Sequence, residues 1–94
     1  MKRGIRIDPA DNVGIVLEHV EPGDELSIDG LLICAKEAID LPHKIALTDI
    51  ALGENVIKYG SVIGYATQPI EKGQHVHVHN VDSEKMMKLG QETW

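Results

Sequence analysis

The chain has 94 residues, enough for one small domain with a thin core, and its formal net charge at pH 7 is −6. This charge excludes a general nucleic-acid binder, which needs clustered Lys and Arg side chains to displace counterions from phosphates. With no Phe and only 3% aromatic residues, the chain is not expected to enclose a deep apolar pocket. A cleft shared with a partner is favoured.

Along the chain, the apolar pattern predicts short strands separated by Gly and Pro. The expected strands lie at residues 5–7, 13–17, 27–33, 44–47, 56–59, 62–66 and 75–80. Asp29-Gly30 indicates a hairpin with a type I′ turn, which needs positive φ at both central residues. Gly14, Gly60 and Gly64 indicate places where another backbone approaches closely.

Two segments favour helical turns. Residues 35–39 suit one turn, which Pro42 prevents from extending. Residues 83–89 suit a short helix with Ser83 as its cap and Gly90 as its stop. We therefore expect a single domain over residues 1–94, with its core at about residues 12–80 and a helical tail at 83–90.

A weak repeat occurs three times: a β-branched residue, two variable residues, Gly, two polar residues and an apolar residue. The copies lie at residues 20–26, 50–56 and 70–76. Each is interpreted as a tight corner whose Gly adopts positive φ and whose flanking aliphatic side chains enter the core. The uneven spacing argues against a solenoid. The pattern predicts a small all-β fold that is folded over on itself.

The cysteine content and the apolar runs indicate the compartment. The lone cysteine, Cys34, cannot form an intramolecular disulfide, and the three aliphatic residues before it suggest that it is buried. The sequence shows neither a signal peptide nor an apolar run of about 18 residues. We therefore expect a cytoplasmic protein without a membrane span.

Residues 75–80 read HVHVHN and carry the strongest chemical signal. On a strand, the three histidines would share one face and the two valines would face the core. Histidines two positions apart, about 6.6 Å between Cα atoms, can converge on one metal ion. His75 and His79, about 13 Å apart on a strand, could share an ion only if the chain bent strongly. Metal ligation, acid–base catalysis, anion binding and an ordinary exposed edge all remain open from this pattern.

Two further clusters supply cations to this acidic chain. They are Pro42-His43-Lys44 and Lys58-Tyr59-Gly60. Each alone is typical of a solvated loop. Together they provide two ammonium groups, which a substrate that bears a carboxylate would require.

At this point several ordered motifs carry a family resemblance. They are PHKIAL at 42–47, DIALGE at 49–54, IKYG at 57–60 with IGYAT at 63–67, and Gly73 followed by VHVHN at 76–80. Over about residues 12–80 the chain resembles the N-terminal SAF-type domain of the altronate/galactarate dehydratase family. The resemblance implies a small β-clip fold related to the antifreeze-like domain. It also implies a part in sugar-acid dehydration, in which a large domain carries most of the machinery and a divalent metal, often Fe²⁺.

The sequence ends at Trp94, where a fused enzyme of this family would continue. In this it resembles two-subunit members, which include sulfolactate sulfo-lyases; a trimmed piece of a longer enzyme is the alternative. The resemblance implies a large dehydratase subunit as partner, which holds most of the metal site. It also implies a small carboxylate substrate, either a sugar acid or sulfolactate. On this reading the chain is a lyase component and not an enzyme by itself.

The resemblance and the residue chemistry together nominate seven site residues. The expected catalytic residues are His43, His77 and His79, of which His77 and His79 are also candidate metal ligands. The expected substrate-binding residues are Lys44, Lys58, Tyr59 and Asn80. His75 is discounted, because the family accepts other residues at its position.

Two other classes of function stay open. Related β-clip domains also serve as non-catalytic ligand-binding or lid modules attached to other enzymes, and the histidines would then close over a substrate held elsewhere. In the second alternative, the chain is a scaffold that only mediates oligomerisation, and exposed aliphatic side chains control assembly.

Overall fold

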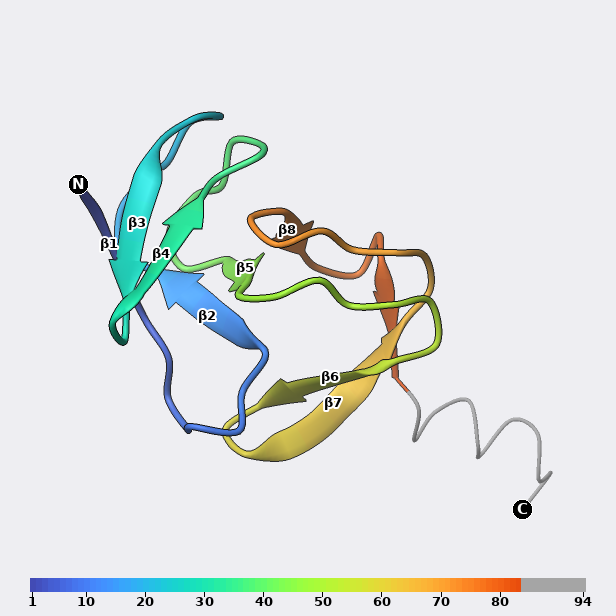
Figure 1. The fold of residues 1–94 in the computed structure, drawn as a ribbon. Helices are drawn as coiled ribbons and strands as arrows, with labels where there is room; N and C mark the ends of the chain where they lie inside the picture. Colours follow the sequence, from blue (N-terminus) through green and yellow to red (C-terminus); the bar gives the residue numbers. More distant parts are fainter. Residues whose placement is uncertain (84–94) are drawn as a thin grey trace, which may run out of the picture.

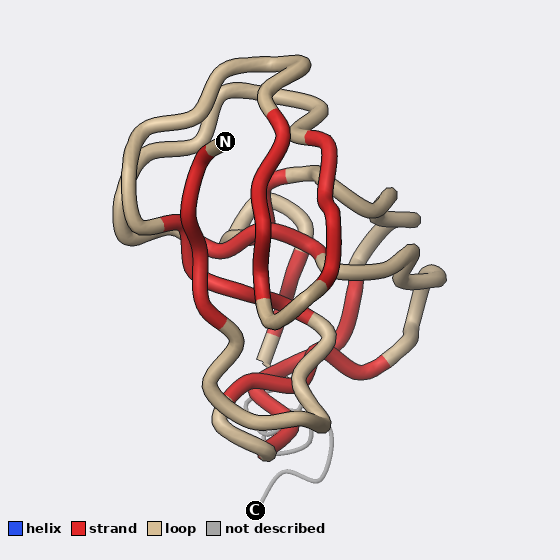
Figure 2. The backbone as a smooth tube through the Cα atoms, turned by 60° about the vertical axis from the view of Figure 1, so that its left-hand side comes forward, coloured by secondary structure: helices blue, strands red, loops and turns tan. Residues whose placement is uncertain are grey.

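The computed structural model describes residues 1–83, which form nine short β-strands and no helix (Figure 1, Figure 2). The strands are β1 (Lys2–Ile5), β2 (Val13–Val16), β3 (Glu25–Ile28), β4 (Leu31–Cys34), β5 (Lys44–Ala46), β6 (Asn55–Lys58), β7 (Ser61–Ala66), β8 (His75–Val76) and β9 (Val81–Asp82). The prediction of an all-β fold is confirmed for this part of the chain. None of the described residues forms a helix long and apolar enough to cross a membrane.

The strands form a six-stranded sheet in the order β4-β3-β1-β2-β5-β8 and a three-stranded sheet in the order β6-β7-β9. Strands β1 and β3 pair in parallel, and the other pairings are antiparallel. In Figure 1, β1 to β4 gather on one side and β6 and β7 on the other, with β5 and β8 between them. Neighbouring residues of β5 serve two separate apolar cores: Ile45 belongs to one and Ala46 to the other. Strand β5 therefore joins the two halves of the molecule.

The three predicted corners are confirmed. Gly23, Gly53 and Gly73 have φ angles of 92°, 84° and 94°. The apolar residues at both ends of each corner are buried: Val20, Leu26, Ile50, Val56, Ile70 and Val76. Each glycine N–H donates to an alanine carbonyl of a neighbouring segment. The acceptors are Ala35 and Ala66 at 2.8 Å and Ala46 at 2.9 Å. The repeat is therefore one backbone corner used three times.

The hairpin predicted at Asp29-Gly30 is confirmed, with φ angles of 50° and 79° between β3 and β4. The turn between β6 and β7 has the same form, with φ angles of 56° at Tyr59 and 71° at Gly60. Its backbone N–H groups donate to the buried carboxylate of Asp11 at 3.1 and 2.8 Å. Burial acts to raise the pKa of Asp11, but backbone donors outweigh it and hold this pKa below its usual range. The Lys-Tyr-Gly loop is thus a fixed turn.

The close backbone approaches expected at Gly14 and Gly64 are confirmed, but a Cβ atom at Gly60 would instead meet the side chain of Asp8, at 2.9 Å. A Cβ atom at Gly14 would lie 2.9 Å from the Ile5 carbonyl oxygen, and one at Gly64 would lie 2.2 Å from the Asp82 carbonyl oxygen. A side chain at Gly64 would therefore separate β7 from β9.

The helical turn expected at residues 35–39 is wrong. The Lys36 N–H donates to the carbonyl of Gly73 at 2.9 Å, and Ile39 forms an antiparallel bridge with Val20. These bonds to distant segments replace the local bonds of a helix. The helix expected at residues 83–89 lies outside the described residues, apart from Ser83.

Two smaller expectations also fail. Cys34 is exposed, because side chains alternate along β4 and Ile33 takes the buried position. The first strand runs over Lys2–Ile5 instead of residues 5–7, because it pairs with β2 on one side and β3 on the other.

Candidate functional site

The strand predicted at residues 75–80 is wrong beyond its first two residues. Strand β8 ends at Val76, and a tight turn follows over residues 77–80. Val76 is buried as expected, but Val78 is 80% exposed instead of facing the core. The alternation of a strand therefore does not set the direction of the later histidines.

The buried side chain of Asn80 closes this turn. Its Oδ1 accepts the backbone N–H of His77 at 3.0 Å, and its Nδ2 donates to the carbonyl of His75 at 2.8 Å. The backbone N–H groups of Asn80 and Val81 both donate to the His77 carbonyl at 3.0 Å. The amide of Asn80 is thus engaged inside the turn, where it positions two histidines. Its contact with a substrate stays a prediction.

Four imidazole rings lie together at this turn: His43, His75, His77 and His79. They are named here the histidine cluster. The ring of His43 lies 5.0 Å from that of His75 and 5.1 Å from that of His77, between centroids. The rings of His75 and His77 are stacked at 5.7 Å, and those of His75 and His79 are 5.3 Å apart. The strong bend required for His75 to approach His79 is therefore present.

His75, which the family resemblance discounted, lies at the centre of this cluster. Its Nε2 is 3.1 Å from Nδ1 of His43, and it contacts all three other rings. Its backbone is held by pairing with Ile45 and by the Glu37 carboxylate, which accepts the His75 N–H at 2.9 Å. Its spacing of two residues from His77 was the sequence signal that could have kept it among the candidates.

The surroundings of His75 and His77 favour neutral imidazoles. Desolvation is the largest cause that lowers the pKa of His75, and the nearby His43 and His79 lower it further, while Glu37 acts in the opposite direction. Desolvation also lowers the pKa of His77, and Lys44 is the next cause. A histidine with a pKa below 6.5 is neutral at pH 7. Such a ring can accept a proton or bind a metal ion.

Of the two predicted lysines, Lys44 lines one hollow together with His77, and Lys58 is an electrostatic neighbour of Lys44. Burial lowers the pKa of Lys44, and repulsion by Lys58 lowers it further, so the two ammonium groups are electrostatic neighbours. The Lys58 ammonium lies 4.8 Å from the centroid of the Tyr59 ring. Electrostatic interactions therefore connect His77 with Lys44 and Lys44 with Lys58, and Lys58 contacts the Tyr59 ring.

A shallow hollow of about 220 Å³ lies beside the cluster. Its lining combines a cationic, an imidazole, a carboxylate and a hydroxyl group with apolar side chains: Lys44, Ile63, His77, Val78, Val81, Asp82 and Ser83. A larger hollow of about 430 Å³ lies elsewhere, next to Cys34 and Lys36, and none of the predicted site residues lines it. The smaller hollow is therefore the one that suits the chemistry.

The cluster can supply some, but not all, ligands of a metal ion. No three His, Cys, Asp or Glu side chains within residues 1–83 are arranged to hold a metal. The contact between His43 and His75, however, places two nitrogen donors side by side. Imidazole nitrogen suits first-row transition metals. The metal role of His77 and His79 stays a prediction.

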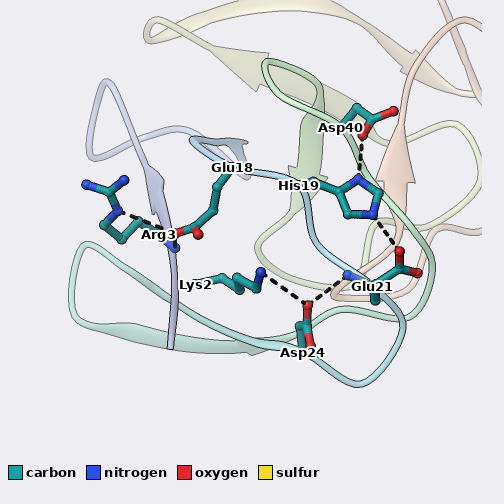
Figure 3. Close-up of polar contacts among 7 residues, drawn as sticks. All are labelled: Lys2, Arg3, Glu18, His19, Glu21, Asp24 and Asp40. Carbon is teal, nitrogen blue, oxygen red and sulfur yellow. Dashed lines mark hydrogen bonds and ion pairs between the residues drawn. The ribbon is translucent and has the colours of Figure 1, made fainter.

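A fifth histidine, His19, lies in the opposite electrostatic environment (Figure 3). Its Nδ1 pairs with the carboxylate of Asp40, and its Nε2 lies 2.6 Å from the carboxylate of Glu21. The hydrogen bond to Glu21, followed by the one to Asp40, raises the pKa of His19. The surroundings of this exposed ring therefore favour its cationic form, whereas those of His75 and His77 favour the neutral form.

The family described as altronate/galactarate dehydratase SAF domain matches residues 2–84. The chain is 47% identical over 76 residues to an altronate dehydratase of Escherichia coli, a match that covers 81% of this chain and 15% of that protein. It is 36% identical over 74 residues to an Escherichia coli galactarate dehydratase (L-threo-forming), which covers 77% of this chain and 14% of that protein.

A relative of a different size is the (2R)-sulfolactate sulfo-lyase subunit alpha of Chromohalobacter salexigens. The two are 44% identical over 85 residues, covering 83% of this chain and 90% of that subunit. The chain thus spans nearly the whole of this subunit but only 15–16% of the altronate dehydratases that it matches.

Proposed function

Because this chain belongs to the altronate/galactarate dehydratase SAF domain family, we propose that it is the small component of a lyase acting on a hydroxy acid. The substrate is a sugar acid, or sulfolactate as the name of one relative indicates. A larger polypeptide completes the active site. This proposal of a larger polypeptide is supported by the altronate dehydratases, because the chain matches only 15–16% of their length.

The observation that carries this proposal is the face that joins the histidine cluster to two lysines. Among residues 1–83, none of the four clustered rings forms a hydrogen bond with a carboxylate; the one hydrogen bond between two of these rings joins His43 and His75. Neutral imidazoles next to ammonium groups suit a negatively charged substrate that must lose a proton. A purely structural histidine is more often satisfied by a local partner, as His19 is.

The proposed chemistry is a β-elimination. The bond between the α-carbon and its hydrogen breaks, and the proton passes to a neutral imidazole, for which His77 is the first candidate. Lys44 and Lys58 bind the substrate carboxylate and stabilise the negative charge that develops on it. The electron pair of the broken C–H bond forms the Cα–Cβ double bond as the bond to the β-leaving group breaks. A second histidine, His43 or His79, which must carry a proton at this step, protonates the departing hydroxyl group, which leaves as water. Sulfite would leave with its own electron pair and need no such proton.

Two other residues would orient the reactants. Tyr59 stands beside Lys58 on a fixed turn and is 59% exposed, so its hydroxyl is free to approach a substrate. Asn80 acts through the backbone of the turn that carries His77. A divalent metal, Fe²⁺ by family resemblance and held mainly by the larger polypeptide, would supply Lewis acidity toward substrate oxygens. Cluster nitrogens would provide its ligands from this chain.

The test is the substitution His77→Ala in the complex of this chain with its larger partner. We expect turnover of the preferred substrate among altronate, galactarate and sulfolactate to fall by about 100-fold or more, the usual contribution of a general acid or base. His19→Ala is the matched control and should retain full activity. Activity near wild type in the His77→Ala complex would remove this residue from the site.

The same experiment separates the lid alternative. A module that only closes over the substrate would raise KM upon His77→Ala and leave kcat nearly unchanged, because it contributes equally to ground-state and transition-state binding. A proton-transfer residue lowers kcat instead. Steady-state kinetics over a range of substrate concentrations distinguish these outcomes.

A further inference from the structure

The closest approach between functional groups of the histidine cluster joins two ring nitrogens. Nδ1 of His43 and Nε2 of His75 are 3.1 Å apart. Two nitrogens bound to one tetrahedral Zn²⁺ at about 2.0–2.1 Å would stand about 3.3 Å apart. The observed spacing differs from this by only a few tenths of an ångström. A small rotation of either ring would therefore allow both nitrogens to face one ion.

We propose that His43 and His75 form a two-point chelate for a divalent first-row transition metal, through Nδ1 of His43 and Nε2 of His75. This pair differs from the His77 and His79 pair expected from the sequence. It is a half-site, because residues 1–83 contain no group of three metal-holding side chains. The remaining positions would be filled by water in the isolated chain and by groups of the larger polypeptide in a complex. Its place in catalysis rests on the proposed function, but metal binding by the chain does not.

The backbone on both sides of the pair is well anchored. The His43 N–H donates to the Asp40 carbonyl at 2.7 Å, and the His43 carbonyl accepts from Val16 at 3.1 Å. His75 pairs with Ile45 in β5, two residues after His43. Because the two ligands stand on adjacent, hydrogen-bonded segments, little backbone entropy is lost when an ion joins them.

The surroundings favour metal binding at this pair over the carboxylate-flanked His19. An imidazole must be neutral to offer a lone pair to a metal. His19 forms hydrogen bonds with the carboxylates of Glu21 and Asp40, which favour its cationic form, whereas within residues 1–83 none of the clustered rings forms a hydrogen bond with a carboxylate. Late first-row ions prefer imidazole nitrogen, so Zn²⁺ and Co²⁺ are suitable probes.

The test uses the full 94-residue chain and Zn²⁺ alone, measured by titration calorimetry at pH 7. We expect one ion per chain, with His43→Ala and His75→Ala each raising the Kd by at least tenfold. His19→Ala is the matched control and should leave the Kd unchanged. No zinc binding by the wild-type chain would overturn the inference, as would unchanged affinity after either cluster substitution or lost affinity after His19→Ala.

A second measurement does not depend on the variants folding correctly. In the wild-type chain, ¹⁵N spectra of the imidazoles should show zinc-induced shifts at Nδ1 of His43 and Nε2 of His75. Shifts confined to His19, or to His77 and His79, would contradict the assignment.

The outcome is separable from that of the proposed function. A chain that fails to bind zinc while its His77→Ala complex loses turnover would exclude the chelate and leave the lyase role intact. Zinc binding together with full activity of the His77→Ala complex would support the chelate and remove His77 from the active site.

Discussion

His19 and His75 stand at two corners with the same backbone and opposite surroundings. In the corner over residues 20–26, the Glu21 N–H donates to the Asp24 side chain at 2.9 Å; in the corner over 70–76, the Glu71 N–H donates to the Gln74 side chain at 2.7 Å. Around the first corner, carboxylates pair with His19 and with the amino terminus of the fold, where Lys2 meets Asp24 and Arg3 meets Glu18 (Figure 3). Around the third corner, imidazoles gather instead.

The difference shows that the same backbone corner can carry either surface ion pairs or a histidine cluster. The side chains and segments around the corner determine which of the two forms. The first corner faces solvent, where ion pairs are screened and contribute little to stability. The third corner packs against the segment after β4, since the Gly73 carbonyl accepts from Lys36 and the His75 N–H donates to Glu37. A fixed backbone whose imidazoles form no ion pair within residues 1–83 suits a site, whereas an exposed ion-paired histidine suits a surface.

The largest contrast should come from the corner glycines. A Cβ atom at Gly73 would lie 2.0 Å from the Cys34 carbonyl oxygen, whereas one at Gly23 would meet nothing within 4 Å. Gly23→Ala should therefore cost only the strain of positive φ, about 1–2 kcal/mol. Gly73→Ala adds a backbone clash and should cost about 3 kcal/mol or more. Urea unfolding measures both, and equal losses would show that the third corner is as open as the first.

The next effect concerns the turn that carries the histidine cluster. Asn80→Ala removes a buried side chain and leaves the part-buried His77 N–H and His75 carbonyl without this partner, which should cost about 1–3 kcal/mol. Asn55→Ala, at an exposed position of β6, is the control and should stay within about 0.5 kcal/mol of wild type. If the turn opens, NMR titration should show the pKa values of His75 and His77 returning toward 6.5. Unchanged values would mean that Asn80 does not hold the cluster together.

The smallest effect is a pair of opposite pH dependences in the metal-free chain. The pKa of His19 is raised by folding, so its contribution is fully present below pH 6.5 and is lost as the pH rises through its folded pKa. The pKa of His75 is lowered, so the unfolded chain takes up that proton first and stability falls as the pH drops below 6.5. His19→Gln should therefore be most destabilising at low pH, and His75→Gln should remove an acid-induced loss. Thermal unfolding at pH 5.5 and 8 checks both signs.

Much of the scaffold was predictable because its signals are local. The glycine spacing of the three corners and the Asp29-Gly30 turn depend on φ preferences that each residue carries by itself. Tyr59, in contrast, adopts positive φ only because Asp11, far away in sequence, accepts hydrogen bonds from the backbone of its turn. The same limit explains residues 35–39, whose bonds go to Gly73 and Val20 instead of forming a helix.

The site was predictable in composition but not in geometry. The HVHVHN segment, His43 and the two lysines are recognisable by their chemistry, and the structure brings the histidines and Lys44 together. The alternating strand was wrong because the side chain of Asn80 turns the chain back at residue 77. The pairing of His43 with His75 depends on the β5–β8 register, which involves segments about 30 residues apart and has no local signal.

The most direct test of the central claim is a structure of this chain bound to its larger partner and a substrate analogue. We predict that the partner covers the face that carries His77 and Lys44, with the analogue's carboxylate within hydrogen-bonding distance of Lys44 or Lys58. A complex in which the clustered imidazoles face solvent, away from the analogue, would contradict the assignment of this face to the active site.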